Sequence, residues 1–401
     1  MATSAEGHRR RKNKSKKKKT GLTTAHDLPE HLLERIIICL GPSPCLVRAA
    51  AVCRRWCRVV ADAGFLARLR AAHVHATVVG YYHEDEEQPK PVFAPSSLAV
   101  DRRRFSLDSF PGVGLMNDSR GSLLLLVSMW KIGSSRDLMV CEPLTGGRQR
   151  ILWPSSALGD GLGVFHCLVD NGRHISMSSF RILSAVTKTL ACVFSSGSNG
   201  GWRLVRTPAT RVDVELPISY YFDENFVGRV NGLLYFGIQG NDAVLVLDET
   251  SAQFSAVVFP VNIWGSFHIG VSRVIGGGDG VLRIVRVISN VVKIFKQGRG
   301  GDDNEWVLEK QLELLEATVG LPGRDETLFE QGAKIVVANA DYILMTPLLT
   351  PATKTWLFSV ELDTMQVENE HERNKYAGPA YPYELPWPPV LPDHSRGRRR
   401  R

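Results

Sequence analysis

Four cysteines stand close together near the amino end of this sequence, and cysteine thiolates are common zinc ligands. In the order Cys39, Cys45, Cys53 and Cys57 they are six, eight and four positions apart. A structural zinc site needs paired ligands at short spacing, as in Cys-x2-Cys. No such pair occurs here, and the His73-x-His75 motif has no second pair to complement it. We therefore expect reduced thiols and no metal site.

A glycine-rich segment at residues 276–280 is the next candidate, because such loops can bind phosphate through backbone amides. The segment lacks the Lys-Ser/Thr ending of a P-loop, and a strand-like run follows it. It is therefore expected to be a hairpin turn. Neither a Gly-x-Ser-x-Gly nucleophile elbow nor a His-Glu-x-x-His zinc helix occurs in the chain. The sequence thus predicts no catalytic residues and no cofactor, and it argues against an enzyme.

The strongest pattern in the chain is helical and covers residues 28–65. Pro29 suits the first turn of a helix, and Asp27 before it can cap that helix. The prolines at 42 and 44 then break the helix, and a second apolar helix follows, continuing or kinking towards residue 60. The apolar residues of the first helix recur at helical spacing; they are Leu32, Leu33, Ile36, Ile37 and Leu40. A unit of about 40 residues rarely stabilises itself through its own core, so this apolar surface predicts a docking partner.

The same stretch contains Leu28-Pro29, then Leu32-Leu33-x-x-Ile36, then residues 46–50, then Val52-Cys53-x-x-Trp56. This order of motifs resembles the F-box of the large plant F-box families. In that family the three-helix motif binds a Skp-type linker, which bridges to a cullin and a RING protein. The resemblance implies that eight residues contact the linker or shape the surface that does: Leu28, Pro29, Leu32, Leu33, Ile36, Val52, Cys53 and Trp56.

From about residue 74 to residue 375 the sequence is strand-like, with short apolar runs that end in Asn, Asp or Gly. The runs are 123–127, 138–141, 191–194, 233–236, 243–247, 281–287, 291–295, 334–338 and 342–345. Helical patterns do not intervene, which favours an all-β sandwich, barrel or propeller.

An internal repeat favours the propeller among these folds. Its markers are Thr145, Trp202, Thr250, Trp306 and Thr364, which are 57, 48, 56 and 58 residues apart. A period of about 50 residues is typical of the blades of a kelch-like β-propeller, and about six blades would fit in this length. The succession of residues 230–235, 245–248 and 254–260 also resembles the propeller-like domain that follows the F-box in many plant F-box proteins; residues 118–125 and 141–146 repeat it more loosely.

The basic charge of the chain lies in its ends. Residues 1–19 carry nine Lys/Arg and one Glu, and residues 396–401 carry five Arg, so the formal charge of +8 leaves −5 for residues 20–395. A dense basic run near the amino end predicts a disordered segment and a nuclear-import signal, although a solvated tail is the alternative. The candidate import residues are Arg9, Arg10, Arg11, Lys12, Lys16, Lys17, Lys18 and Lys19. No aromatic residues interleave with them, so specific nucleic-acid binding is not expected.

The sequence therefore predicts a multidomain α+β protein, in which a small three-helix F-box precedes a mainly antiparallel all-β domain. We expect a disordered basic tail at 1–21, the F-box at 22–73, a β-propeller at 74–375, and a proline-rich, basic, disordered tail at 376–401. No apolar run reaches the roughly 18 residues of a membrane span, and no signal peptide is evident. The expected role is a substrate receptor of a cullin-RING ubiquitin ligase in the nucleus, the cytoplasm or both, with an unknown protein target. A nuclear β-propeller scaffold outside any ligase is the alternative.

Overall fold

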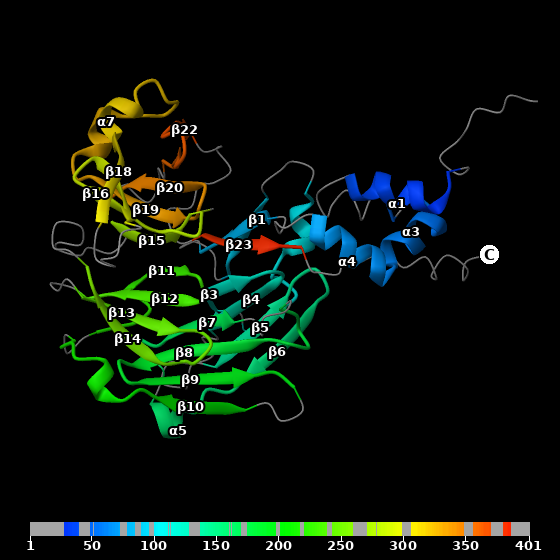
Figure 1. Ribbon diagram of the computed structural model, residues 1–401, viewed down its shortest axis with the longest axis horizontal. Helices are drawn as coiled ribbons and strands as arrows, with labels where there is room; N and C mark the ends of the chain where they lie inside the picture. Colours follow the sequence, from blue (N-terminus) through cyan, green and yellow to red (C-terminus); the bar gives the residue numbers. More distant parts are fainter. Residues whose placement is uncertain are drawn as a thin grey trace, which may run out of the picture. The chain divides into compact units, whose positions relative to one another are not determined.

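The structure is a computed structural model, which describes residues 28–39, 49–50, 52–72, 78–84, 90–95, 100–110, 112, 114–127, 137–159, 161, 163–169, 175–197, 201–216, 220–238, 243–259, 271–277, 279–298, 306–348, 356–369 and 380–385. The chain divides into two compact units, Met1–Val74 with Leu391–Arg401, and His75–Val390. The first unit contains helices and the second contains β-sheets (Figure 1).

Where the structure describes the first unit, it contains helices α1 (Glu30–Cys39), α3 (Arg54–Ala61) and α4 (Ala63–Ala72). Helix α1 begins directly after Pro29, whose carbonyl accepts the amides of Leu32 and Leu33 at 3.1 Å each. Residues 49, 50 and 52 are helical as well, but Cys53 is extended at φ −163° and interrupts the helix before α3. The predicted continuation or kink towards residue 60 is therefore an interruption at Cys53. The predicted cap Asp27 and the break at 41–44 lie outside the described residues.

The helices of this unit enclose a small core. Its fully or nearly fully buried apolar residues are Leu33, Ile37, Ala49, Ala50, Val59, Val60, Phe65 and Leu69. The Asp62 carboxylate accepts the amide of Phe65 at 2.7 Å and so starts helix α4. Arg68 forms an ion pair with Glu34 at 2.6 Å, which joins α4 to α1. No helix among the described residues is long and apolar enough to cross a membrane.

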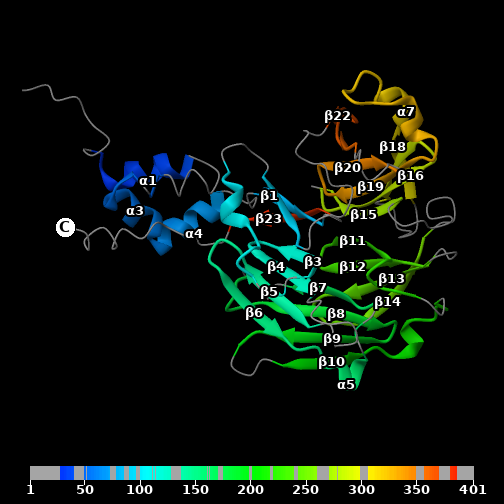
Figure 2. The same ribbon diagram turned by 180° about the vertical axis from the view of Figure 1, so that it is seen from behind.

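The second unit consists of antiparallel meanders, each running from an inner to an outer strand. The first is β3 (Leu115–Arg120), β4 (Leu123–Val127), β5 (Leu138–Glu142) and β6 (Gly147–Ile151). The second is β7 (Phe165–Val169), β8 (Arg181–Thr187), β9 (Leu190–Ser195) and β10 (Trp202–Arg206). The group β7 to β10 is clear in both views (Figures 1 and 2).

Two further meanders share one eight-stranded sheet. They are β11 (Phe226–Val230), β12 (Leu233–Gly237), β13 (Ala243–Asp248) and β14 (Phe254–Val258), and then β15 (Ser272–Gly276), β16 (Leu282–Ile288), β17 (Val291–Gln297) and β18 (Trp306–Glu313). A parallel contact between Gly228 of β11 and Val274 of β15 joins them. Only glycine permits this approach, because a Cβ at position 228 would lie 2.1 Å from the Val274 carbonyl oxygen.

The remaining strands complete the unit. One meander is β19 (Ala333–Ala338), β20 (Tyr342–Pro347), β21 (Phe358–Glu361) and β22 (Val367–Asn369). The last group combines β1 (Val78–His83) and β2 (Val92–Pro95) with β23 (Ala380–Glu384) from the far end of the chain, in the order β2-β1-β23. The connecting segments contain α5 (Ser155–Leu158), α7 (Leu314–Ala317) and the short 3-10 helices η1 (Arg102–Phe105), η2 (Ala209–Arg211) and η3 (Glu326–Phe329).

Strand β23 corrects the predicted carboxyl tail. The predicted bounds placed residues 376–401 in a proline-rich, basic, disordered tail, while packing across a blade edge or a linker was the expectation for residues 381–392. The structure shows that residues 380–384 are not disordered, because they pair antiparallel with β1. Tyr383 is fully buried and makes edge-on ring contacts with Tyr82 and Phe105, at centroid distances of 5.8 and 5.5 Å. The segment forms a strand in spite of its prolines, because burying its aromatic side chains stabilises the strand.

The inner strands follow one another around the unit. Strand β23 lies beside β3, β3 beside β7, and β15 beside β19. The rings of Phe165 in β7 and Phe226 in β11 stack at 4.6 Å, and the hydroxyls of Tyr342 in β20 and Tyr81 in β1 share a hydrogen bond. Together with the β11–β15 contact, these interactions connect the meanders one after another and link the last one back to the β2-β1-β23 group. The predicted mainly antiparallel, propeller-like β domain is confirmed.

Burial explains why the predicted strands read as continuous apolar runs. Strands β4, β5 and β7 are buried at every position, because neighbouring sheets cover both of their faces. Outer strand β6 is more exposed and alternates between Ile151 inside and arginines outside. All nine predicted runs coincide with strands, and the glycine-rich segment after β15 forms the predicted hairpin, in which Gly277 donates to the Val281 carbonyl at 3.0 Å.

Candidate functional site

Exposed apolar side chains on the helical unit form the first candidate site. Leu32 is 37% exposed, Ile36 is 43% exposed, and Val52 is 61% exposed. They contrast with Leu33 and Ile37, which lie on the inner side of α1 and are fully buried. A small helical unit that leaves large apolar residues in water is suited to docking against an apolar groove of a partner.

The structure places the eight predicted linker-binding residues in three environments. Leu32, Ile36, Val52 and Pro29 are exposed, whereas Leu28, Cys53 and Trp56 are half-buried, and Leu33 belongs to the core. Arg55 donates a hydrogen bond to the Leu28 carbonyl, which fixes the start of α1 against α3. The structure therefore separates residues that can touch a partner from one that supports the helix. Linker contact itself stays a prediction.

The structure adds no support for a metal site or for the predicted nuclear-import signal. Within the described part of the chain, no group of three or more His, Cys, Asp or Glu side chains could hold a metal ion. Cys39 is exposed, and Cys53 and Cys57 are half-buried without forming a disulfide. The basic run at residues 9–19 lies outside the described residues.

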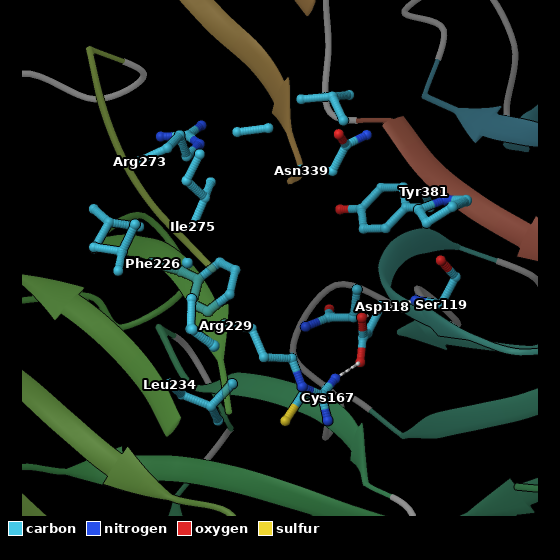
Figure 3. A pocket seen from close by; sticks show the side chains of 18 of the residues that line it. Asp118, Ser119, Cys167, Phe226, Arg229, Leu234, Arg273, Ile275, Asn339 and Tyr381 are labelled. Atoms are coloured by element: carbon cyan, nitrogen blue, oxygen red, sulfur yellow. Dashed lines mark hydrogen bonds and ion pairs between the residues drawn. The ribbon is translucent and has the colours of Figure 1, made fainter. Parts of the chain in front are cut away.

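The second candidate site is a cavity of about 930 Å³ in the β unit. Its walls come from the inner strands β3, β7, β11, β15, β19 and β23, together with parts of β1, β4 and β12. Figure 3 shows its side chains, with Asp118 and Arg229 facing each other and Arg273 on another strand. Central cavities of this kind are where binding sites of β-propellers can form, because every inner strand contributes side chains.

Arg229 is the main link in the cavity's charge network. Its Nε donates to Glu249, its Nη2 donates to the Leu168 carbonyl at 2.7 Å, and its Nη1 lies 3.5 Å from Asp118 Oδ2. Glu249 is only 7% exposed and also lies 3.6 Å from Nη1 of Arg120. Arg229 therefore links β11 to β7 and balances the charges of two acidic groups, Glu249 and Asp118.

Burial raises the pKa of Asp118 from 3.8 to about 7, and the charge of Glu249 acts in the same direction. The amides of Leu168 and Ser119, which donate to its carboxylate at 2.7 and 2.9 Å, and the charge of Arg120 oppose this rise. Burial also raises the pKa of Glu84, which accepts the Met116 amide at 2.7 Å, and that of Glu384. Asp118, Glu84 and Glu384 thus hold protons more tightly than carboxyl groups in water do.

The pKa of Asp118 predicts a pH-dependent stability difference between the natural protein and Asp118→Asn. The unfolded chain releases this proton near pH 4 and the folded protein near pH 7, so ionisation destabilises the fold increasingly across that interval. Relative to the variant, the natural protein should lose on the order of 2–4 kcal/mol of unfolding free energy between pH 4 and pH 8. Urea unfolding at several pH values would measure the difference. His83, whose pKa burial lowers to about 4, is common to both proteins and cancels. A difference that does not change with pH would contradict the assignment.

The sequence did not identify these cavity residues. Asp118 and Arg229 are more than 100 positions apart and belong to no known motif. Arg120 and Arg229 each stand at or near the end of an inner strand, just before a glycine turn. Aligning the two repeated segments would still not have paired them, because Arg120 lies opposite Leu123 in its hairpin, the place that Val230 takes opposite Leu233, whereas Arg229 lies opposite Leu234.

Comparisons with known proteins define the class. The family model described as "F-box protein AT5G49610-like, beta-propeller" matches residues 115–391, and a model described as "F-box-like" matches residues 25–69. The chain is therefore an F-box protein with a β-propeller. It belongs to the AT5G49610-like family of F-box β-propeller proteins.

Similarity to individual proteins is distant. No curated protein matches the chain. Among solved structures, the β-propeller domain of Cps50 (Swd1) from Myceliophteria thermophila is 10% identical with a TM-score of 0.34, over 64% of this chain and 72% of that one. A protein of unknown function from Bacteroides caccae is 7% identical with a TM-score of 0.41, over 76% and 99%. A chain of a nidogen–laminin complex is 11% identical with a TM-score of 0.39, over 75% and 95%. All three scores are low, so the family assignment rests on the sequence models.

Proposed function

We propose that this protein is the substrate-receptor subunit of an SCF-type cullin-RING ubiquitin ligase. In this role the F-box binds a Skp-type linker, and the propeller binds the protein that is to be ubiquitinated. An F-box followed by a β-propeller is typical of non-catalytic substrate adaptors. The observation that carries the proposal is the F-box itself, whose helix α1 buries Leu33 but exposes Leu32 and Ile36.

The mechanism requires no chemistry in this chain. A receptor that holds a target next to the charged conjugating enzyme makes their reaction effectively intramolecular, which raises the local concentration of the target lysine. The propeller suits this role because its sheets are rigid and its connecting loops can present varied side chains.

Linker binding gives a direct test. Replacing both Leu32 and Ile36 with alanine should weaken a complex with a purified Skp-type linker at least about ten-fold, since buried apolar anchors contribute on the order of 1–2 kcal/mol each. Isothermal calorimetry would measure the affinity. A matched double variant, His31→Ala with Arg35→Ala, changes two exposed residues of the same helix and should bind within about two-fold of the natural protein.

Leu33→Ala provides the third comparison. Because Leu33 is fully buried, this variant should lower the thermal stability of the helical unit, whereas the Leu32/Ile36 variant should not. If the natural protein binds none of the common Skp-type linkers, the ligase proposal fails. If a linker binds but no cullin copurifies from cells, a scaffold outside the ligase becomes the better account.

A further inference from the structure

Arg273 of β15 differs from the other arginines of the cavity. Its Nη1 donates to the Ser272 carbonyl at 2.9 Å, and its Nη2 donates to the Ile335 carbonyl at 3.3 Å. Both partners are neutral, and in the part of the chain that the structure describes no carboxylate forms an ion pair with it. Burial lowers its pKa to about 10, so the guanidinium still carries its charge at neutral pH.

A cation that burial removes from water is costly unless an anion meets it. Two carbonyls use two of the five N–H donors of the guanidinium, so three donors remain. Arg229 shows the contrasting arrangement in the same cavity, because Glu249 and Asp118 already balance its charge. An anionic ligand would therefore be stabilised most at Arg273, because the charge of this arginine is not yet balanced.

A second donor lies on the neighbouring wall. Asn339 lines the cavity, and its side-chain oxygen accepts the amides of Asp341 and Tyr342 at 2.8 Å each. These bonds fix the side chain and leave its NH2 group as the remaining donor. Figure 3 shows Asn339, which directly follows β19, and Arg273 of β15 around the same space.

The rest of this wall is apolar. Ile275 follows Arg273 on the same face of β15, and Phe226 and Leu234 line the adjoining side. The volume of about 930 Å³ lies within the range of pockets that hold small molecules. A ligand that fits would therefore combine one anionic group with an apolar body.

Neighbouring acidic residues limit how much negative charge the ligand can carry. Glu84, Asp118 and Glu384 share the cavity, and Asp223 and Glu224 also line it. These acidic groups would repel a dianion such as phosphate. A single carboxylate carries less charge, and the planar guanidinium can hold it through two parallel hydrogen bonds. We propose that the cavity binds a small organic acid, whose carboxylate pairs with Arg273 and whose apolar body packs against Phe226 and Ile275. This site is independent of linker binding by the F-box.

Saturation-transfer NMR on the full chain tests the proposal with defined probes. Phenylacetate and 3-phenylpropionate should receive saturation from the natural protein, and the uncharged phenylacetamide should bind at least about ten-fold more weakly, because it lacks the charge that Arg273 recognises. Inorganic phosphate in equal concentration should displace phenylacetate poorly. Equal binding of the acid and its amide, efficient displacement by phosphate, or no binding of either acid would overturn the proposal.

Variants locate the site. Arg273→Gln should weaken phenylacetate binding at least about ten-fold. Arg283→Gln is the matched control, because it removes the same charge from the adjacent strand β16 outside the cavity, and it should leave binding unchanged. Circular dichroism would confirm that both variants fold. If Arg273→Gln does not fold, the comparison of acid with amide on the natural protein decides the matter alone.

Discussion

Replacing Arg229 with methionine should lower the free energy of unfolding by about 3–5 kcal/mol at neutral pH, because it leaves buried acidic groups without their main counter-charge. Glu249 is 7% exposed and would keep its ion pair with Arg120 at 3.6 Å, but it would lose the direct hydrogen bond from Arg229. The link from Arg229 to the Leu168 carbonyl would also be lost. Methionine keeps an unbranched apolar stem like that of arginine but lacks the guanidinium, so the change removes the charge and its hydrogen bonds while packing of the stem remains. Urea unfolding followed by circular dichroism would measure the loss.

Arg283 offers a matched control, because it also bridges two carboxylates. Its guanidinium lies 2.8 Å from Asp279 and 2.7 Å from Glu309, whose side chains are 32% and 25% exposed, whereas Glu249 is 7% exposed. Lys296 contacts the same two carboxylates at 3.2 and 3.6 Å and would remain after Arg283→Met. This variant should therefore cost less than about 1 kcal/mol, and salt should reduce the cost further. Equal losses for the two arginines would show that the burial of Glu249 does not determine the cost of removing its partner.

The repeat markers show how much of the β fold could be predicted from the sequence. All five stand where the third strand of a meander passes to the fourth. Trp202 and Trp306 open β10 and β18, and the threonines stand in the turns before β6, β14 and β22. Thr145 and Thr364 each donate a hydrogen bond to a glutamate three residues earlier, which explains why the threonine recurs. The near-regular spacing thus reflected a repeated turn structure.

The cavity could not be predicted in the same way, because its chemistry depends on contacts between different meanders. Arg229 reaches Leu168 and Asp118, which come from β7 and β3. No local pattern records such a contact, and burial rather than residue type decides whether an aspartate such as Asp118 has an unusual pKa. The F-box shows a similar limit, since Leu32 and Leu33 are neighbours in sequence and only the packing of α1 assigns one to the surface and the other to the core.

Removing residues 380–401 should abolish the cooperative unfolding of the β unit, because β23 completes the sheet that begins with β1. The strand contributes Tyr383 to a buried aromatic cluster with Tyr82, Phe93 and Phe105. Tyr381 also donates to the Met116 carbonyl at 3.0 Å, and the Glu384 amide donates to the Gly121 carbonyl at 2.9 Å. Loss of one buried aromatic residue costs about 3–5 kcal/mol, and a domain is stable by only about 5–15 kcal/mol. Far-ultraviolet circular dichroism during urea unfolding would test this expectation.

A shorter deletion separates the strand from the charge of the tail. Removing only residues 391–401 takes away all the arginines of the carboxyl end but keeps β23, so this protein should unfold at nearly the same urea concentration as the full chain. Tyr383→Ala should fall between the two deletions, with a loss of about 3–5 kcal/mol. If the longer deletion unfolds at the same urea concentration as the shorter one, β23 is dispensable and the β unit is held together without joining its two ends. The expected order of the three proteins follows from burial, because Tyr383 is fully buried and its ring contacts Tyr82, Phe93 and Phe105, which precede it by more than 270 positions.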